Sequence, residues 1–220
     1  MIKELLSLIA DAIYPPKCIA CDALLGADRE DRGYICLDCN SRIVWLESDF
    51  FSANLKKQEF DSSRSLAAYD GAWQEVVHKF KYNNRTDLAF VLGEMLSRRI
   101  DYEYDLITAV PLHPKRLRER GYNQSALLAK VVAKKTGFKF NLGIFKRVKH
   151  SAPQVGLAKE ERMENIRGAF EPCGSWKAKD ADILLIDDVI TTGATVNECA
   201  KVLKKAGAGR VDVMTIARAI

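Results

Sequence analysis

Three short apolar runs constrain the fold of this 220-residue chain more than any other feature. They are rich in branched side chains and occupy residues 105–112, 182–187 and 210–219. Such runs are typical of strands buried on both faces of a parallel sheet. Segments with helical periodicity precede the first run, at 72–82 and 86–100, and follow it, at 123–135; a further helix is expected to end near Gly207. This alternation predicts an α/β fold with a mainly parallel, twisted sheet flanked by helices.

Composition excludes few functions but limits the location of the protein. The net charge of +5, from 34 Lys and Arg against 29 Asp and Glu, is too small to diagnose nucleic-acid binding. No apolar stretch has the length of a transmembrane helix, so no membrane insertion is expected. The N-terminal residues 1–18 have helical apolar spacing, but Glu4 and Asp11 interrupt it, which argues against a signal peptide. A short amphipathic helix and a reducing, cytoplasmic location are therefore predicted.

Four of the six cysteines form two pairs with metal-ligand spacing. These are Cys18, Cys21, Cys36 and Cys39. A two-residue gap lets both thiolates of a pair face one metal ion, and the 14 intervening residues can bring the pairs together. Two disulfides or a redox-active pair are the alternatives, but a reducing compartment disfavours the first, and no thioredoxin-like context supports the second. We predict a structural zinc module at 1–45, a connector at 46–62 and the main domain at 63–220.

The segment 183–195, ILLIDDVITTGAT, places two acids where the buried strand is expected to end. Adjacent carboxylates such as Asp187 and Asp188 can accept hydrogen bonds from a vicinal diol or bind a metal shell. The turn after them, at the start of a helix, combines hydroxyls, a glycine and unpaired N–H groups suited to a phosphate. Its residues are Thr191, Thr192, Gly193, Ala194 and Thr195. The sequence thus favours a sugar-phosphate site, the alternative being an ordinary helix cap.

A basic stretch follows the strand at 105–112. The segment 110–124, VPLHPKRLRERGYNQ, begins with Val110 and Pro111 at the expected strand end. Its four cations are Lys115, Arg116, Arg118 and Arg120. Cations near a helix N-terminus oppose the helix dipole, so an anionic partner, either a diphosphate or a nucleic-acid backbone, would explain their placement. A solvated basic helix start is the alternative.

Residues 150–170 are expected to begin as a loop and end as a polar, charged helix. An exposed connection of this kind can serve as a mobile flap, although most such loops are only solvated.

Together these motifs resemble the ComF family. The segment 183–195 is similar to the phosphoribosyl pyrophosphate (PRPP) signature of type I phosphoribosyltransferases. The other matches are the paired cysteines, FKY at 80–82, the segment 110–124, and a spaced series at 150–170. That series comprises Gln154, Leu157, Arg162, Asn165 and Gly168–Phe170. The resemblance implies a type I phosphoribosyltransferase-like domain with a small N-terminal zinc module built on four cysteines.

The resemblance also implies roles for these residues. Asp187 and Asp188 would contact ribose hydroxyls, the turn Thr191–Thr195 would hold the 5′-phosphate, and Mg²⁺ would bind largely through the diphosphate of PRPP. The residues expected beside the diphosphate are Val110, Pro111, Arg116 and Arg120. Flap residues Gln154, Arg162 and Asn165 would help to exclude water.

The function implied is Mg²⁺-dependent transfer of a phosphoribosyl group to an acceptor that the sequence does not identify, linked to DNA uptake and competence. The alternative is a non-catalytic module that senses PRPP or a nucleotide and binds single-stranded DNA or a competence helicase. A glutamine amidotransferase is not expected. The chain begins Met-Ile-Lys-Glu rather than with a nucleophilic cysteine, and it has no room for that domain.

Overall fold

A computed structural model describes residues 15–25, 34–47, 57–149, 165–174 and 177–220. Its main sheet has the strand order β1-β6-β5-β2, and all three pairings are parallel. The strands are β1 (Ser62–Ala68), β6 (Arg210–Arg218), β5 (Asp182–Ile190) and β2 (Leu106–Ala109). The three apolar runs form β2, β5 and β6, which confirms the predicted α/β fold.

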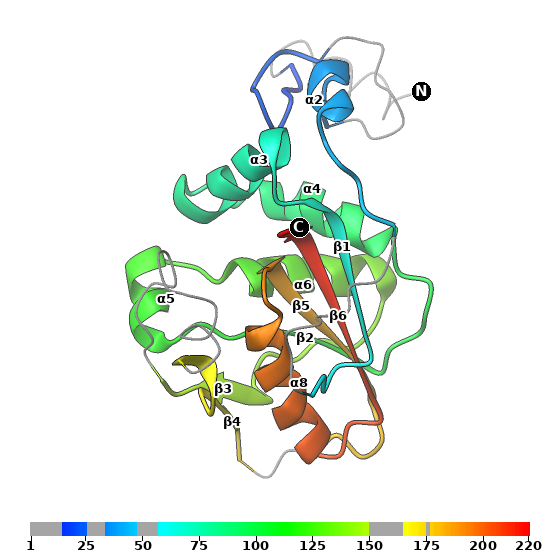
Figure 1. Ribbon diagram of the computed structural model, residues 1–220, viewed down its shortest axis with the longest axis vertical. Coiled ribbons are helices and arrows are strands. Elements are labelled where there is room, and N and C mark those ends of the chain that lie inside the picture. The colour runs from blue at the N-terminus through cyan, green and yellow to red at the C-terminus, as the bar shows by residue number, and fades with distance from the viewer. Residues whose placement is uncertain (1–14, 26–33, 48–56, 150–164, 175–176) are drawn as a thin grey trace, which may run out of the picture.

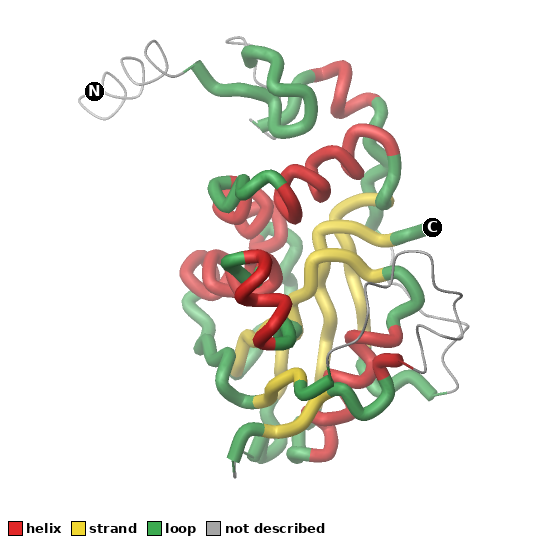
Figure 2. The backbone as a smooth tube through the Cα atoms, turned by 90° about the vertical axis from the view of Figure 1, so that its left-hand side faces the viewer, coloured by secondary structure: helices red, strands yellow, loops and turns green. Residues whose placement is uncertain are grey.

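Helices cover both faces of this sheet (Figures 1 and 2). The helices α3 (Gly71–Tyr82), α4 (Leu88–Ser97) and α6 (Gln124–Thr136) share a core with one face. The helix α8 (Ala194–Lys205) packs on the other face. Two shorter helices are α2 (Leu37–Ser41) and α5 (Pro114–Arg120).

Alternate residues of β5 fill the two cores. Leu184 and Ile186 belong to the core with α3, α4 and α6, whereas Ile183 and Leu185 belong to the core with α8. Because both faces of the strand are buried, its sequence shows no alternation with polar residues. The indole N–H of Trp73 donates to the carbonyl of Ile216 at 2.7 Å and fixes α3 against β6.

Two features differ from the sequence-based expectation. The strand β5 does not end at the aspartates: its pairing with β6 continues to Ile190, which lies opposite Arg218. The aspartates therefore sit on a rigid ladder rather than in a loop. In addition, β3 (Phe145–Arg147) and β4 (Phe170–Pro172) form an antiparallel pair that the sequence patterns did not indicate. Most of the expected flap, residues 150–164, lies outside the described residues.

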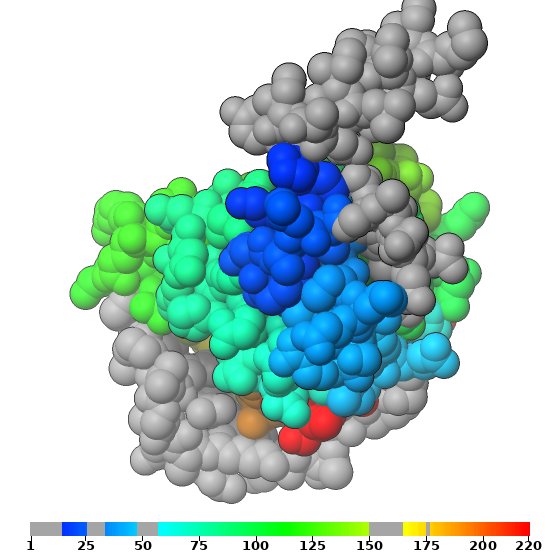
Figure 3. Space-filling view, turned by 90° about the horizontal axis from the view of Figure 1, so that it is seen from above, coloured from blue at the N-terminus to red at the C-terminus, as the bar shows by residue number. Residues whose placement is uncertain are grey.

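The cysteine-bearing segments 15–25 and 34–47 pack over α3, as the view from above shows (Figure 3). Cys18, Ile19 and Cys39 are buried in the same core cluster as Trp73 and Val76. The helix expected at 1–18 lies largely outside the described residues. Among the helices that the structure describes, none combines the length and hydropathy needed to cross a membrane.

Candidate functional site

Each of the two aspartates is held by one of its carboxylate oxygens. Asp187 is buried, and its Oδ1 accepts from Ser125 Oγ at 2.8 Å and from the Asp188 amide at 2.9 Å. Asp188 Oδ1 accepts from the Val189 amide at 2.6 Å and lies 3.0 Å from Lys81 Nζ. Among the described residues, no group donates to Oδ2 of either aspartate. The pair can therefore offer two acceptor oxygens to a ligand without losing an internal hydrogen bond.

Residues 80–82 and 110–124 meet beside this carboxylate pair. The Tyr122 hydroxyl donates to the Phe80 carbonyl at 2.8 Å, and Gln124 Nε2 donates to the Lys81 carbonyl at 3.3 Å. Gln124 Oε1 in turn accepts from Arg120 Nη1 at 2.9 Å. These contacts satisfy carbonyls at the end of α3, which have no partner within the helix. The two motifs thus form one structural unit.

The turn between β5 and α8 has the backbone that a phosphate site requires. Gly193 caps α8 with a φ of 77°, in the left-handed region that favours glycine. Thr192 Oγ1 accepts from the Ala194 amide at 3.3 Å. Thr191 is exposed, and Thr195 lies half-buried in the first turn of the helix. The N-terminus of a 12-residue helix therefore opens next to the paired aspartates.

Replacement of Gly193 by alanine is expected to strain this turn. A β-carbon in the left-handed region costs roughly 1–2 kcal/mol, so the free energy of unfolding should fall by about that amount. Urea denaturation measures the change. Gly143→Ala is the matched control, because Gly143 does not have a φ in that region, and it should leave stability nearly unchanged. Equal effects of the two substitutions would show that the turn is not under this constraint.

The residues expected beside a diphosphate all follow the carboxyl end of β2 in the sequence. The Val110 amide donates to the Ile186 carbonyl at 3.0 Å, which places Val110 and Pro111 next to the aspartates. Arg120 is held by Gln124, and its guanidinium lies 5.4 Å from the centre of the Tyr82 ring. Arg116, on α5, is partly exposed, with its Nη1 at 3.9 Å from Glu119 Oε2.

The expected flap residues are placed only in part. Gln154 and Arg162 lie outside the described residues. Asn165 is exposed, three residues before Gly168. The Gly168 amide donates to Glu198 Oε2 at 2.9 Å, so the returning end of this segment is attached to α8. The segment therefore re-enters the body at the helix that follows the Thr191–Thr195 turn.

The environment of Asp187 predicts a dependence of stability on pH. Burial and the neighbouring Asp188 carboxylate raise the pKa of Asp187 to about 7, against the lowering effects of Ser125, the Asp188 amide and Lys81. Arg147 on β3 and Cys199 on α8 also interact with it. From about pH 4 to about pH 7 this carboxyl is protonated in the folded state but ionised in the unfolded one. Its contribution to stability should therefore decrease as the pH rises through that window.

Asp187→Asn removes this titration. The free energy of unfolding of the variant minus that of the unsubstituted protein should increase from about pH 5 to about pH 7.5. Urea unfolding of both proteins at the two pH values measures this difference. A stability difference that is the same at the two pH values would contradict the assignment.

The four cysteines at the N-terminus converge on one point. Their Sγ atoms all lie within 4.8 Å of one another, and those of Cys21 and Cys36 are 3.7 Å apart. Four thiolates at about 2.3 Å from a central zinc ion would be separated by about 3.8 Å, so the spacing fits a tetrahedral metal site. Burial opposes ionisation of the Cys18 thiol, but backbone N–H groups, those of Cys21 and Cys36 first, lower its pKa to about 7. The cluster can therefore bind a metal such as zinc.

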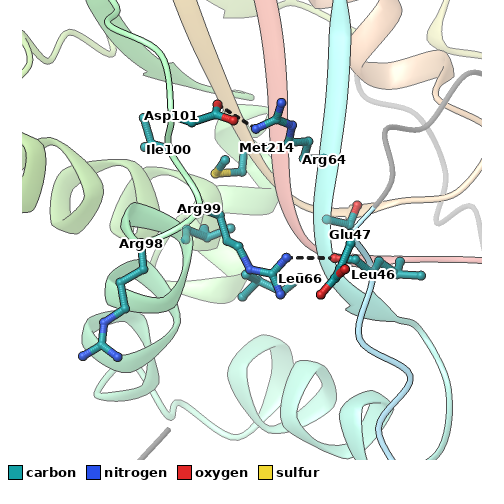
Figure 4. Close-up of a pocket in the computed structure, with 11 residues that line it drawn as sticks. Leu46, Glu47, Arg64, Leu66, Arg98, Arg99, Ile100, Asp101 and Met214 are labelled. Atoms are coloured by element: carbon teal, nitrogen blue, oxygen red, sulfur yellow. Dashed lines mark hydrogen bonds and ion pairs between the residues drawn. The ribbon is translucent and has the colours of Figure 1, made fainter. Parts of the chain in front are cut away.

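A pocket of about 370 Å³ lies at the opposite edge of the sheet, between β1, the end of α4 and residues 46–47 (Figure 4). Arg64 Nη1 lies 2.7 Å from Asp101 Oδ1, and Arg99 Nη1 donates to the Leu46 carbonyl at 3.1 Å. None of its lining residues belongs to 80–82, 110–124 or 183–195. It is therefore separate from the candidate site.

Three residues at the site were not predicted from the sequence to belong to a sugar-phosphate site. Lys81 was noted only as part of FKY, Ser125 follows the basic segment, and Arg147 lies in β3. The first two contact the aspartates directly. Burial lowers the pKa of Arg147, whereas Cys199 and Asp187 raise it and Arg116 lowers it further. Of these three residues, only Lys81 had a signal in the sequence, namely the match of FKY to a family motif.

Comparisons with known proteins agree with this geometry. Residues 123–220 match the family model described as a phosphoribosyl transferase domain. Competence protein F of Haemophilus influenzae is 29% identical over 193 residues, which cover 84% of each chain. The DNA utilization protein YhgH of Salmonella typhi is 30% identical over 164 residues, or 71% of each chain. Competence protein ComFC of Streptococcus pneumoniae is 27% identical over 210 residues, covering 86% of this chain and 90% of that protein.

Proposed function

The chain belongs to the ComF family, and we propose that it binds PRPP where β2 and β5 end at the same edge of the sheet. The observation that carries this proposal is the pair of aspartates. Each keeps Oδ1 for internal hydrogen bonds and leaves Oδ2 without a donor among the described residues. Two such oxygens, beside a glycine-containing turn at a helix N-terminus, suit a ribose diol that carries a 5′-phosphate.

Each part of the ligand has a matching group on the protein. Asp187 and Asp188 would accept hydrogen bonds from the ribose hydroxyls, and the backbone N–H groups of the Thr191–Thr195 turn would bind the 5′-phosphate. Arg116, on α5, would meet the diphosphate. Arg120 would act from a fixed position, because Gln124 and the Tyr82 ring hold its guanidinium.

We propose further that the bound sugar is transferred. An acceptor nucleophile would attack C1 of the ribose, forming the new C1 bond as the C1–oxygen bond breaks and diphosphate leaves with its electron pair. Positive charge would develop on the ribose ring in this reaction, and carboxylates that hold the ribose hydroxyls would stabilise it. Mg²⁺, bound with the ligand, supplies positive charge for the departing diphosphate. The protein residues orient the sugar and, through the 150–165 flap, exclude water.

We propose a structural role for the cysteine cluster. Four thiolates would close the coordination sphere of a zinc ion and leave no position open for a substrate. A reducing cytoplasm, in which thiols persist, fits this assignment.

A second function is favoured by the exposure of α5. The described side chains of this helix include none that is buried, and it carries Lys115, Arg116 and Arg118. A basic, exposed helix suits a nucleic-acid backbone. The relatives are named for competence and DNA utilization, so we propose a role in DNA uptake. In this alternative, PRPP or a nucleotide acts as a signal rather than a substrate, and single-stranded DNA or a helicase is the partner.

The two functions are separated by one set of measurements. Isothermal titration should detect PRPP binding in the presence of Mg²⁺. Release of diphosphate is then followed with a panel of nucleobases and other amine acceptors. Turnover with any acceptor supports the transferase. Tight PRPP binding without turnover, together with salt-sensitive binding of single-stranded DNA, supports the sensing module. Absence of PRPP binding would overturn the transferase and would leave the sensing module only with a nucleotide as its signal.

A further inference from the structure

Lys81 is a partly buried cation to which the roles above assign no function. It lies near the end of α3, and its Nζ is 3.0 Å from Asp188 Oδ1. The Lys81 and Asp188 side chains are 18% and 15% exposed, so water screens this ion pair only weakly. Burial alone would lower the pKa of Lys81, but the Asp188 carboxylate raises it above its ordinary value. The lysine is therefore charged in the folded protein.

The contact with Lys81 determines which oxygen of Asp188 faces the site. Asp188 Oδ1 forms an ion pair with Lys81 Nζ at 3.0 Å and accepts a hydrogen bond from the Val189 amide at 2.6 Å. An ion pair and a hydrogen bond on the same oxygen together fix the rotation of the carboxylate. Within the described part of the chain, Oδ2 receives no donor, so it is the oxygen that remains for a ligand hydroxyl.

The backbone around Lys81 is fixed as well. The carbonyls of Phe80 and Lys81 accept from Tyr122 and Gln124, as described above. The Phe80 side chain is fully buried. A lysine that only reached into solvent would not need such support, whereas a lysine that sets the orientation of another side chain does.

The charge balance gives Lys81 a second role. Two adjacent carboxylates that face a polyanionic ligand would repel it and would be costly to keep ionised in a site shielded from water. A cation bound to one of the carboxylates reduces both the repulsion of the ligand and the cost of the adjacent negative charges. Removal of the lysine would leave a partly buried carboxylate without its partner.

We propose that Lys81 is a positioning residue for the ribose subsite: its ion pair with Asp188 Oδ1 turns this carboxylate so that Oδ2 meets the sugar hydroxyls. This inference rests on the proposed function, because it assumes a ribose phosphate at the aspartates. It differs from a direct contact between Lys81 and the diphosphate, which would act on PRPP alone.

The test compares two ligands that share the ribose 5-phosphate part, namely PRPP with Mg²⁺ and ribose 5-phosphate itself. Lys81→Met should lower the affinity for both ligands by a similar factor, about 10- to 100-fold. Lys81→Arg should restore part of that affinity. Asp188→Asn removes the same partner, so Lys81→Met combined with Asp188→Asn should bind no more weakly than Asp188→Asn alone. Lys134→Met, at an exposed site on α6, is the control and should change neither affinity by more than about twofold.

Each outcome decides the proposal. Unchanged affinities in Lys81→Met would overturn it, and so would a loss confined to PRPP or a fully additive double variant. If Lys81→Met does not fold, as judged by urea unfolding, Lys81→Gln is measured against the same criteria. Failure of the unsubstituted protein to bind either ligand would instead overturn the proposed function, so the two failures are distinguishable.

Discussion

Substitution of both Asp187 and Asp188 by asparagine is expected to weaken PRPP binding by about 100-fold or more. Each carboxylate leaves Oδ2 for a ribose hydroxyl, and a hydrogen bond to a charged group contributes about 1.5–3 kcal/mol. Two such bonds lost together amount to at least about 3 kcal/mol, or more than about 100-fold in the dissociation constant. Asparagine preserves the shape of the side chain and one oxygen, so the change tests charge rather than packing. Isothermal titration in the presence of Mg²⁺ measures the effect.

Asp101→Asn is the matched control for this double variant. Asp101 is an acid paired with Arg64 beside the pocket at the other edge of the sheet, and its loss should change the affinity for PRPP by less than about twofold. Because the double variant also loses the Lys81 ion pair, its folding is verified by urea unfolding. An affinity for PRPP equal to that of the unsubstituted protein would remove the main support for the site.

The same double variant separates catalysis from DNA handling. Transfer requires the ribose to be held at the aspartates, so diphosphate release should disappear. Binding of single-stranded DNA, if it occurs at the exposed cations of α5, should persist and remain sensitive to salt. Loss of both activities together would indicate that the nucleic acid occupies the carboxylate site, which neither proposed function predicts.

The strands of the sheet were predicted well from the sequence, because burial on both faces of a strand is visible in the local run of apolar residues. A strand buried on both faces must be apolar at successive positions, and residues 183–186 meet this requirement directly. The end of β5 was predicted less well. Asp187 and Asp188 interrupt the apolar run, yet pairing with β6 carries the strand on to Ile190. Side-chain polarity reports burial, whereas the strand boundary is set by hydrogen bonds to a distant segment.

The family was also predicted correctly, since the motifs lie in a specific order along the chain. What the sequence did not reveal was how those motifs contact one another. Nothing in the local pattern of FKY indicates that Lys81 reaches Asp188 or that Tyr122 binds the carbonyl of Phe80. Such contacts depend on how α3, α5 and β5 pack. The β3–β4 pair was missed for a similar reason, since three-residue strands carry too little periodicity to be recognised.

The cysteine cluster leads to the second large expected effect, because it is part of the main core. Cys18 and Cys39 are buried in the cluster that contains Trp73 and Val76 of α3. Lys79 Nζ, also on α3, donates to the Ala20 carbonyl at 2.7 Å, between two of the cysteines. It also pairs with Asp22, and this pairing lowers the pKa of that carboxyl. A change in the cysteine cluster should therefore reach the helix that carries Lys81.

Cys39→Ser is expected to remove the bound metal and to lower the free energy of unfolding by about 4 kcal/mol or more, the size expected when a structural metal is lost. Cys173→Ser is the matched control, because Cys173 is half-buried and lies outside the cluster. The stability and the metal content of this variant should stay nearly unchanged. Metal content is measured by elemental analysis and stability by urea unfolding.

If the metal holds the cysteine segments on α3, the Cys39→Ser variant should also bind PRPP more weakly, because α3 positions Lys81 beside Asp188. The loss should be smaller than that of Lys81→Met, since the contacts of Tyr122 and Gln124 with the end of α3 remain. A purified protein that contains no metal, with Cys39→Ser as stable as the original, would show that the segments pack without an ion. Loss of metal with full PRPP affinity would show that the cluster supports the core but does not reach the site.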